Sequence, residues 1–308
     1  MKSKHQNISR RSALKGAAAA VAGGLLLKSG RASADDNPNW KIEKGRIKQS
    51  VVSWCFNPMK VEELAAAAAQ MGLQSVELCD PKTWPALKKL GLTCAIAGSH
   101  GFVSGFNHVE NHDICVDKVT QSIDASADFG CPSVICFSGM KKLKPSDANC
   151  PEISSEEGLK NCVEGLKKVI GHAEKKKITL CLEVLNSRVD INMKGHPGYQ
   201  ADKLEWAVEM CDKIGSPNMK ILFDIYHIQI MEGDIITRIN KYKDYIGHYH
   251  TAGVPGRAEL DDAQELNYPP IIRAIIDTGY KGFLGQEFIP RNKDMIASLR
   301  QGVKLCDV

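Results

Sequence analysis

The sequence predicts an α/β fold in which eight parallel strands close into a (β/α)8 barrel with the helices outside. After residue 40, eight short β-branched or apolar runs are each followed by a helical segment. No linker rich in Gly, Ser or Pro divides this part of the chain, which favours one domain. A doubly wound open sheet is the alternative, but the turn at 53–58 lacks the glycine-rich phosphate pattern usual after the first strand of that fold.

The first half of the barrel is predicted to contain four strands, which are short apolar runs at 47–54, 74–78, 92–97 and 133–137. The helices predicted between them are 60–71, 81–90 and 108–129. Gly72 follows the first of these helices and is a typical C-terminal stop. Pro81 lies in the first turn of the second helix, where a missing backbone donor is tolerated.

The second half repeats this alternation. Its strands are predicted at 178–185, 219–223, 247–249 and 283–288. Its helical segments are predicted at 154–176, 199–214, 235–243, 270–277 and 293–306, and a long loop covers 186–198. Ser154 and Glu157 have the spacing of a capping box at the start of the first helix.

The first residues have the pattern of an export signal. A basic stretch at 9–15 precedes an uncharged apolar stretch at 16–27 and an Ala-Ser-Ala site at 32–34. The Arg10-Arg11 pair resembles a twin-arginine leader, which exports folded proteins. We therefore predict an export signal over 1–34, a barrel domain over 35–308, the twin-arginine machinery as partner and a periplasmic location. The apolar stretch is shorter than the roughly 20 residues that cross a bilayer, so no stable membrane span is expected in the mature protein.

The charge and the cysteine content argue against a nucleic-acid-binding protein and against a disulfide-rich protein. The formal net charge is +4, but much of the excess lies before Trp40, so the body carries no basic stripe for nucleic acid. The 11 cysteines are odd in number and form no C-x-x-C pair. Several of them lie inside strand-like apolar runs, which indicates buried thiols and no disulfide framework. Incidental bridges of Cys150 or Cys306 stay open.

Four candidate metal ligands, Glu183, Asp224, His250 and Glu287, lie at or beside the carboxyl ends of the last four predicted strands. Active sites of such barrels lie at this end, and strands about 4.8 Å apart allow four side chains at one height to surround an ion. Three carboxylates and one imidazole favour one Mg²⁺ or Mn²⁺, with Co²⁺ or Zn²⁺ as alternatives. Each residue alone is weak evidence, but four charged groups in one mouth are costly unless paired or metal-bound.

His227 and Arg257 are predicted to bind substrate. His227 lies three residues beyond Asp224, where an imidazole can reach a substrate oxygen without ligating the metal. Arg257 follows Pro255-Gly256 in a turn, and its planar fork suits a carboxylate or a polyol. A surface ion pair with Glu259 or Asp261 is the alternative for Arg257.

Three further strand-end groups, Glu77, His100 and Asn186, are candidates for the pocket lining. Each has an alternative as a hydrogen-bonding residue that stabilises a loop. For Glu77 this alternative is a carboxylate inside the barrel that accepts from backbone donors.

Several consecutive motifs carry a family resemblance. The chain reads DIYHIQIMEGD at 224–234, GH at 247–248 followed by AGVPGR at 252–257, ELNY at 265–268 and GQEF at 285–288. These segments resemble the hydroxypyruvate isomerase branch of the xylose isomerase-like TIM barrels, most densely over 180–290. The resemblance implies a divalent metal held by Glu183, Asp224, residue 250 and Glu287. It also implies that the two glutamates act as an acid/base pair on either face of the substrate.

One departure bears on the substrate. Hydroxypyruvate isomerases usually carry Gln where this chain has His250, whereas the related ketose 3-epimerases carry His. The Pro-Gly-Arg loop nevertheless resembles the isomerase branch. We therefore expect isomerisation of a small hydroxy-carbonyl compound or sugar, such as hydroxypyruvate to tartronate semialdehyde, with ketose 3-epimerisation as the alternative. Proton removal next to a carbonyl gives an enediolate, which a dication stabilises as a Lewis acid.

Two functions of other classes stay open. A phosphodiesterase resembling endonuclease IV needs a His-rich multinuclear zinc cluster, which His100, His227 and His250 could begin, but the near-neutral body argues against DNA as partner. A non-catalytic exported sugar-binding barrel would keep the pocket without turnover. Whether the protein forms a homo-oligomer also stays open.

Overall fold

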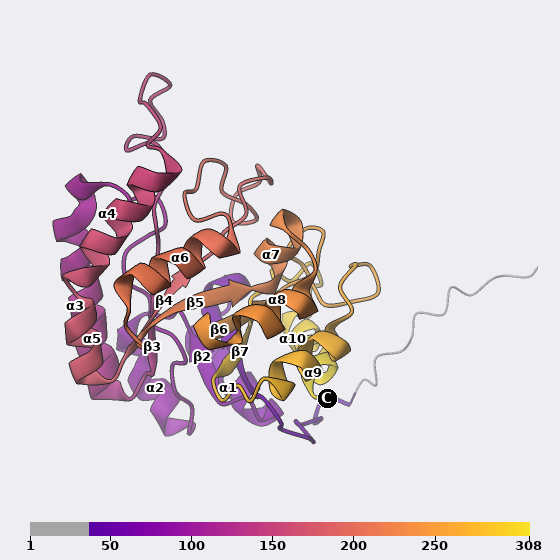
Figure 1. Ribbon diagram of the computed structural model, residues 1–308. Helices are drawn as coiled ribbons and strands as arrows, with labels where there is room; N and C mark the ends of the chain where they lie inside the picture. The colour runs from indigo at the N-terminus through magenta and orange to yellow at the C-terminus, as the bar shows by residue number, and fades with distance from the viewer. Residues whose placement is uncertain (1–36) are drawn as a thin grey trace, which may run out of the picture. The chain divides into compact units, whose positions relative to one another are not determined.

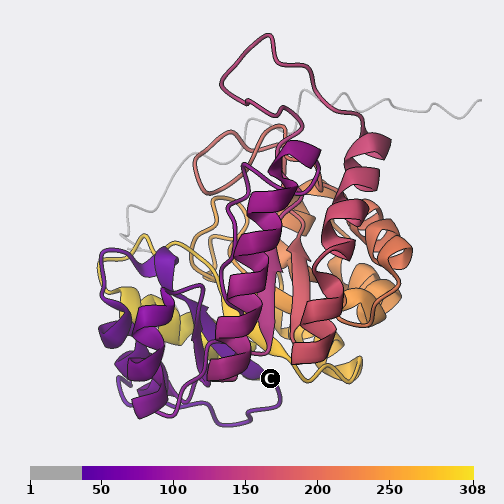
Figure 2. The ribbon, with the colours of Figure 1, turned by 90° about the vertical axis from the view of Figure 1, so that its left-hand side faces the viewer.

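The computed structural model describes residues 37–308, in which seven parallel strands form one curled sheet with helices outside it (Figures 1 and 2). The strand order is β2-β1-β7-β6-β5-β4-β3. The strands are β1 (Lys48–Val52), β2 (Ser75–Glu77), β3 (Ser133–Cys136), β4 (Thr179–Glu183), β5 (Met219–Asp224), β6 (Ile246–Thr251) and β7 (Phe283–Gln286).

The predicted strand at 92–97 lies between β2 and β3 and joins these two edges, but it is not a regular strand. The Val76 N–H donates to the Thr93 carbonyl at 3.2 Å, and the Ala97 N–H donates to the Ser133 carbonyl at 2.9 Å. Between these bonds, the Ala95 N–H donates to the Ser75 hydroxyl oxygen at 2.7 Å, so a side chain replaces a backbone acceptor. The predicted barrel class is confirmed, with seven regular strands and one irregular segment in place of eight strands.

Helices follow the strands in the predicted alternation. They are α1 (Val61–Met71), α2 (Trp84–Lys89), α3 (His112–Phe129), α4 (Ser155–Lys167), α5 (Ile170–Lys176), α6 (Leu204–Ile214), α7 (Ile225–Met231), α8 (Ile235–Tyr242), α9 (Tyr268–Asp277) and α10 (Met295–Cys306). Short 3-10 turns are η1 (Ser53–Phe56), η2 (Pro81–Thr83), η3 (Val109–Asn111) and η4 (Lys243–Tyr245). Gly72 ends α1 in the left-handed conformation, as the sequence predicts.

The main differences from the predicted helices are a division, a later start and an additional helix. The helix predicted over 154–176 is two helices, because the backbone leaves helical geometry at the buried Val169. The helix predicted from 199 begins at Leu204, since Tyr199 is held near the strand ends, where its hydroxyl donates to the Glu183 carbonyl at 3.1 Å. Helix α7, which was not predicted, starts directly after Asp224. The Ser154 cap is confirmed, with its hydroxyl accepting from the Glu157 N–H at 3.1 Å.

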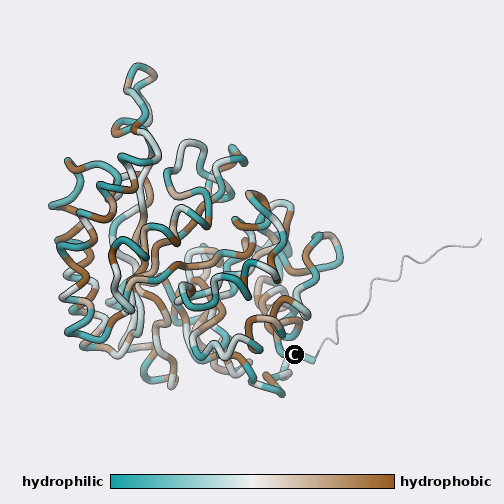
Figure 3. The backbone as a smooth tube through the Cα atoms, viewed as in Figure 1, coloured by the Kyte–Doolittle hydropathy of each residue, from teal (hydrophilic) through white to brown (hydrophobic). Residues whose placement is uncertain are grey.

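The core lies between the strands and the inward faces of the helices. Helices α3 and α5 alternate hydrophobic and hydrophilic residues along their length, whereas β5 is mainly hydrophobic (Figure 3). A smaller cluster inside the barrel consists of Ile96, Ile135, Cys181 and Leu222. The loop between β3 and α4 projects away from the barrel in both ribbon views (Figures 1 and 2).

The predicted export signal lies outside the described residues. Within 37–308, no helix combines the length and the apolar character that crossing a membrane requires. All 11 cysteines lie in this region as free thiols, and all but Cys150 are buried. The expectation of no disulfide framework is confirmed, and neither Cys150 nor Cys306 forms a bridge.

Candidate active site

The four predicted metal ligands converge at the carboxyl ends of neighbouring strands. Glu183 and Asp224 are the last residues of β4 and β5, His250 lies in β6, and Glu287 directly follows β7. The sheet register pairs Asp224 with His250. One donor atom from each of the four side chains lies within 4.8 Å of the others. None of the four residues is more than 5% exposed.

The donor atoms of this cluster suit a hard divalent cation. The Nδ1 atom of His250 lies 2.6 Å from Glu287 Oε2 and 3.9 Å from Glu183 Oε1. His250 Nδ1 and Glu183 Oε1 are buried atoms without a hydrogen-bond partner, so both have free capacity to ligate. Three carboxylates and one imidazole form an oxygen-rich donor set of the kind that Mg²⁺ and Mn²⁺ take. The described residues therefore fit a metal site.

Arg257 reaches the same cluster from the loop after β6. Its Nη2 atom donates to Asp224 Oδ2 at 3.1 Å and to Glu287 Oε2 at 2.6 Å. Its guanidinium also lies over the ring of Trp54, 5.4 Å from the centroid. Burial lowers the pKa of Arg257, but the charges of Glu287 and Asp224 outweigh it and raise the pKa, so the side chain is a permanent cation.

The alternative of a surface ion pair for Arg257 is wrong. Glu259 and Asp261 instead pair with Arg291, at 3.1 Å and 3.2 Å.

The carboxylates of the cluster differ in acidity because their neighbours differ. Burial, together with the charges of Glu287 and Glu183, raises the pKa of Asp224 to about 7 against the opposing effect of Arg257. Burial also raises the pKa of Glu183. Burial acts the same way on Glu287, but the charges of Arg257 and His250 outweigh it and lower the pKa. Of the two glutamates, Glu183 therefore takes up a proton more readily, and Glu287 stays ionised.

His227 lies beside Asp224, and Asn186 lies beside His227. Asp224 caps α7, with Oδ1 accepting from the Tyr226 N–H at 2.8 Å. His227 Nδ1 accepts from the Asn186 backbone N–H at 3.0 Å, and its Nε2 lies 3.5 Å from Asp224 Oδ2. Both side chains have no exposed surface, and neither lines the cavity next to the cluster. These two predicted substrate-binding residues therefore do not reach the cavity in this structure.

A cavity of about 280 Å³ opens beside the cluster, a volume that suits a small molecule. Glu183, Glu287 and Arg257 line it on one side. His100 and Phe102, from the loop after the irregular segment, line another side together with His196 from the loop after β4. The predicted pocket groups His100 and Arg257 thus reach the cavity. Phe102 and His196 were not predicted, because nothing but their place in long loops distinguishes them in the sequence.

His100 is held as a neutral ring at the cavity wall. Its Nδ1 lies 3.1 Å from the carbonyls of both Gly101 and Ser104, and its Nε2 accepts from the Phe137 N–H at 3.4 Å. Because carbonyls only accept, the proton belongs on Nδ1. Burial lowers the pKa of His100 from 6.5 to about 4.

The His100 pKa predicts acid sensitivity. The unfolded chain binds a proton at this residue below pH 6.5 and the folded protein only below about 4, so stability present above pH 6.5 is lost as pH falls through this window. We expect a loss on the order of 1–3 kcal/mol from this residue. Urea unfolding of wild type and His100→Gln between pH 7 and 4 measures it, with the more exposed His172→Gln as control. An equal pH dependence in wild type and His100→Gln would contradict the assignment.

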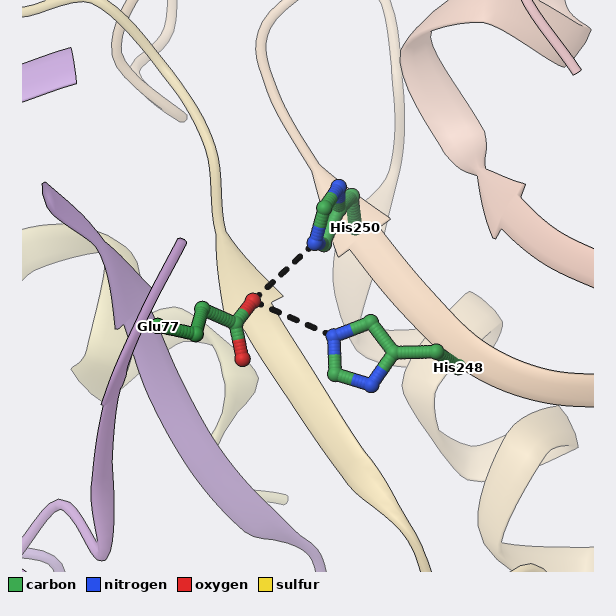
Figure 4. Close-up of side chains that lie close together, drawn as sticks. All are labelled: Glu77, His248 and His250. Carbon is green, nitrogen blue, oxygen red and sulfur yellow. Dashed lines mark hydrogen bonds and ion pairs between the residues drawn. The ribbon is translucent and has the colours of Figure 1, made fainter. Parts of the chain in front are cut away.

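Glu77 is buried, and its carboxylate faces His248 and His250 (Figure 4). It is not among the residues that line the cavity. Its Oε1 lies 3.1 Å from His248 Nε2 and 3.0 Å from His250 Nε2. Burial raises the pKa of Glu77, but the charge of His248 and the hydrogen bonds of the two imidazoles outweigh it and lower the pKa to about 2. The partners are therefore imidazoles and not the backbone donors of the alternative considered from the sequence.

His248 was missed as part of the site. The sequence does contain a signal for it, since residues two apart on a strand face the same side, and His248 precedes His250 by two positions.

With the fold and the cluster established, comparison with known proteins is decisive for the family. A family model described as "Xylose isomerase-like TIM barrel" matches residues 65–305. The chain belongs to the xylose isomerase-like TIM barrel family. The predicted resemblance is confirmed at this level.

Individual relatives of this family member include named isomerases. A 2-oxo-tetronate isomerase of Pectobacterium atrosepticum is 27% identical over 257 residues, which cover 79% of this chain and 91% of the relative. The hydroxypyruvate isomerase of Escherichia coli K12 is 32% identical over 154 residues, which cover 50% of this chain and 57% of the relative. The solved structure titled AP endonuclease, family 2, from Brucella melitensis is 25% identical with a TM-score of 0.68, covering 82% of this chain and 97% of that one. The prediction of an enzyme of the isomerase class is confirmed.

Proposed function

We propose that the protein is a divalent-metal-dependent isomerase that moves a proton between adjacent carbons of a small hydroxy-carbonyl substrate, such as hydroxypyruvate. The observation that carries this proposal is the convergence of Glu183, Asp224, His250 and Glu287 beside a cavity of small-molecule size. The named isomerases among the relatives support the reaction class.

The chain supplies groups for each part of this chemistry. A divalent cation, Mg²⁺ or Mn²⁺, held by the four residues would act as a Lewis acid on the substrate oxygens and stabilise the negative charge left by proton removal. Glu183 lines the cavity, and with one carboxylate oxygen on the cation the other would be available to take a proton from the substrate carbon. Glu287 completes the pair that returns the proton, to the neighbouring carbon for isomerisation or to the opposite face for epimerisation.

Arg257 favours an anionic substrate. Among the described residues that line the cavity, it is the only Lys or Arg side chain. Its Nε is buried and has no hydrogen-bond partner. Because a guanidinium binds carboxylates strongly, we propose that it orients a keto acid in preference to a neutral ketose.

The geometry offers less support to a phosphodiesterase. The described residues form two groups that could hold a metal, and neither contains His100 or His227. The His-rich multinuclear cluster that such an enzyme needs is therefore not assembled from the three histidines considered. One bound ion per chain fits the isomerase, whereas three zinc ions would favour the nuclease.

Proton NMR in heavy water tests the proposal. Protein loaded with Mn²⁺ or Mg²⁺, and then freed of the excess ion, is mixed with hydroxypyruvate and, separately, with common ketoses. We expect hydroxypyruvate to turn over with deuterium incorporation and a chelator to abolish both. Inversion at C3 of a ketose would favour the epimerase instead. Tight sugar binding without any exchange would support the non-catalytic barrel and contradict our proposal.

A further inference from the structure

We propose that Glu77 is a positioning residue for the metal site, which fixes the ring of His250 so that Nδ1 is the nitrogen offered to the cation. His248 holds the same carboxylate from a second side. This inference rests on the metal site of the proposed function. It assigns a role to a carboxylate that does not line the cavity and that meets His250 at Nε2, the ring nitrogen that is not offered to the cation.

Hydrogen-bond chemistry decides which nitrogen of His250 is protonated. Its Nε2 lies 3.0 Å from Glu77 Oε1, and an ionised carboxylate only accepts, so Nε2 must carry the proton. The other ring nitrogen, Nδ1, faces Glu287 and Glu183, so it is the one left to ligate a cation, which displaces the proton that Nδ1 shares with Glu287. A carboxylate behind a ligating histidine fixes its tautomer and orientation in many metal sites.

The barrel is built to let Glu77 reach this position. Glu77 ends β2, whereas His250 is on β6, and β1 and β7 lie between them in the sheet. Figure 4 shows the carboxylate crossing β7 toward the two histidines. On β7 the residue paired with His250 is Gly285. A Cβ there would overlap Glu77 Oε1 and lie 2.8 Å from His250 Cδ2. Glycine at 285 therefore provides the space that the Glu77–His250 contact occupies.

A purely stabilising role explains these contacts less well. Glu77 has no exposed surface, and its second oxygen, Oε2, has no hydrogen-bond partner. A buried carboxylate with a free oxygen is costly for stability. His248 Nε2 lies 3.1 Å from the same Oε1 that meets His250, so both imidazoles act on one atom. The two imidazoles therefore hold Glu77 Oε1 opposite His250 Nε2, whereas Oε2 has no partner. We expect this arrangement if the role of Glu77 is to orient the His250 ring.

Metal affinity of a Glu77 variant provides the first test. Glu77→Gln keeps the size of the side chain but presents a neutral amide to His250. We expect the Kd for Mn²⁺, measured by calorimetric titration of metal-stripped protein, to rise 10–100-fold. Glu232→Gln is the matched control, because Glu232 is a partly buried carboxylate that pairs with Arg238 away from the cluster, and its Kd should not change. A Kd for Glu77→Gln within twofold of wild type, in a folded protein, would overturn the proposal.

Histidine NMR on the wild-type protein provides a test that no folding defect can obscure. With ¹⁵N-labelled histidine, long-range proton–nitrogen spectra report which ring nitrogen of His250 is protonated, and a His250→Asn sample assigns the signal. We expect a proton on Nε2 without metal and with Mg²⁺, and an unprotonated Nδ1 once Mg²⁺ is bound. A proton on Nδ1 and none on Nε2 would overturn the proposal. So would two bound ions per chain, because Nε2, Glu77 and His248 would then ligate the second.

The two tests separate this inference from the proposed function. If the protein binds no divalent ion, the proposed metal chemistry fails, and the presence or absence of a proton on Nε2 in the metal-free protein still decides whether Glu77 fixes the ring. If the ion binds and turnover occurs but Glu77→Gln changes neither, only the role of Glu77 fails.

Discussion

Replacing Glu183 by Gln is expected to slow α-proton exchange of the substrate about 10²–10⁴-fold. The amide cannot accept a proton, whereas its oxygen can still ligate an ion, so the Kd for Mn²⁺ should change far less than the rate. The reason lies in the placement of Glu183: its side chain lines the cavity, and burial raises its pKa. Deuterium incorporation into hydroxypyruvate by NMR and a calorimetric Mn²⁺ titration measure the two quantities.

Glu156→Gln is the control for this experiment, because Glu156 is exposed in the first turn of α4. It should leave both exchange and metal affinity unchanged. Full turnover in Glu183→Gln with the metal retained would remove Glu183 from the proton transfer. Glu287→Gln, measured in parallel, shows whether the second glutamate shares that role.

Replacing Arg257 by Met is expected to lower the free energy of unfolding of the metal-stripped protein by about 3–5 kcal/mol. The guanidinium donates to both Asp224 and Glu287, and its side chain is only 3% exposed. Met fills a similar volume but leaves these buried carboxylates without their cation. Urea unfolding in a chelating buffer measures the loss. Added Mn²⁺ should recover more stability in the variant than in wild type, because the ion would neutralise the same carboxylates.

Arg291→Met is a matched arginine control. Arg291 pairs with Glu259 and Asp261, but its side chain is 58% exposed. Exposed pairs contribute roughly 0–1 kcal/mol, so the control should lose little. A loss in Arg257→Met no larger than in this control would show that the buried guanidinium does not compensate the cluster.

The fold was largely predictable because strands and helices alternate with clear local signals. The exception at 92–97 has a physical cause: the Ser75 hydroxyl takes the Ala95 N–H, a contact between segments that no local pattern reveals. The start of α6 was misplaced for a similar reason, since Tyr199 is held by the Glu183 carbonyl and Ser138 N–H and not by a helical turn. Local periodicity predicts elements, and long-range side-chain contacts decide where they end.

The candidate site was predictable where its residues share the carboxyl ends of adjacent strands. Glu183, Asp224, His250 and Glu287 meet because parallel strands bring their ends to the same height. The surroundings were not predictable, because Glu77 meets His250 across two intervening strands. Such a contact depends on barrel curvature and on the space at Gly285, which no spacing in the sequence expresses.

The two sides of the candidate site come from different parts of the barrel. The four charged donors come from β4, β5, β6 and the residue after β7, whereas His100 and Phe102 come from the loop beyond the irregular segment that joins β2 to β3. The His100 side of the cavity thus follows the least regular stretch of the ring, whereas the four donors are fixed by the register of the regular strands. A substitution at Phe102 would therefore alter the cavity wall without touching a residue of the four-donor cluster.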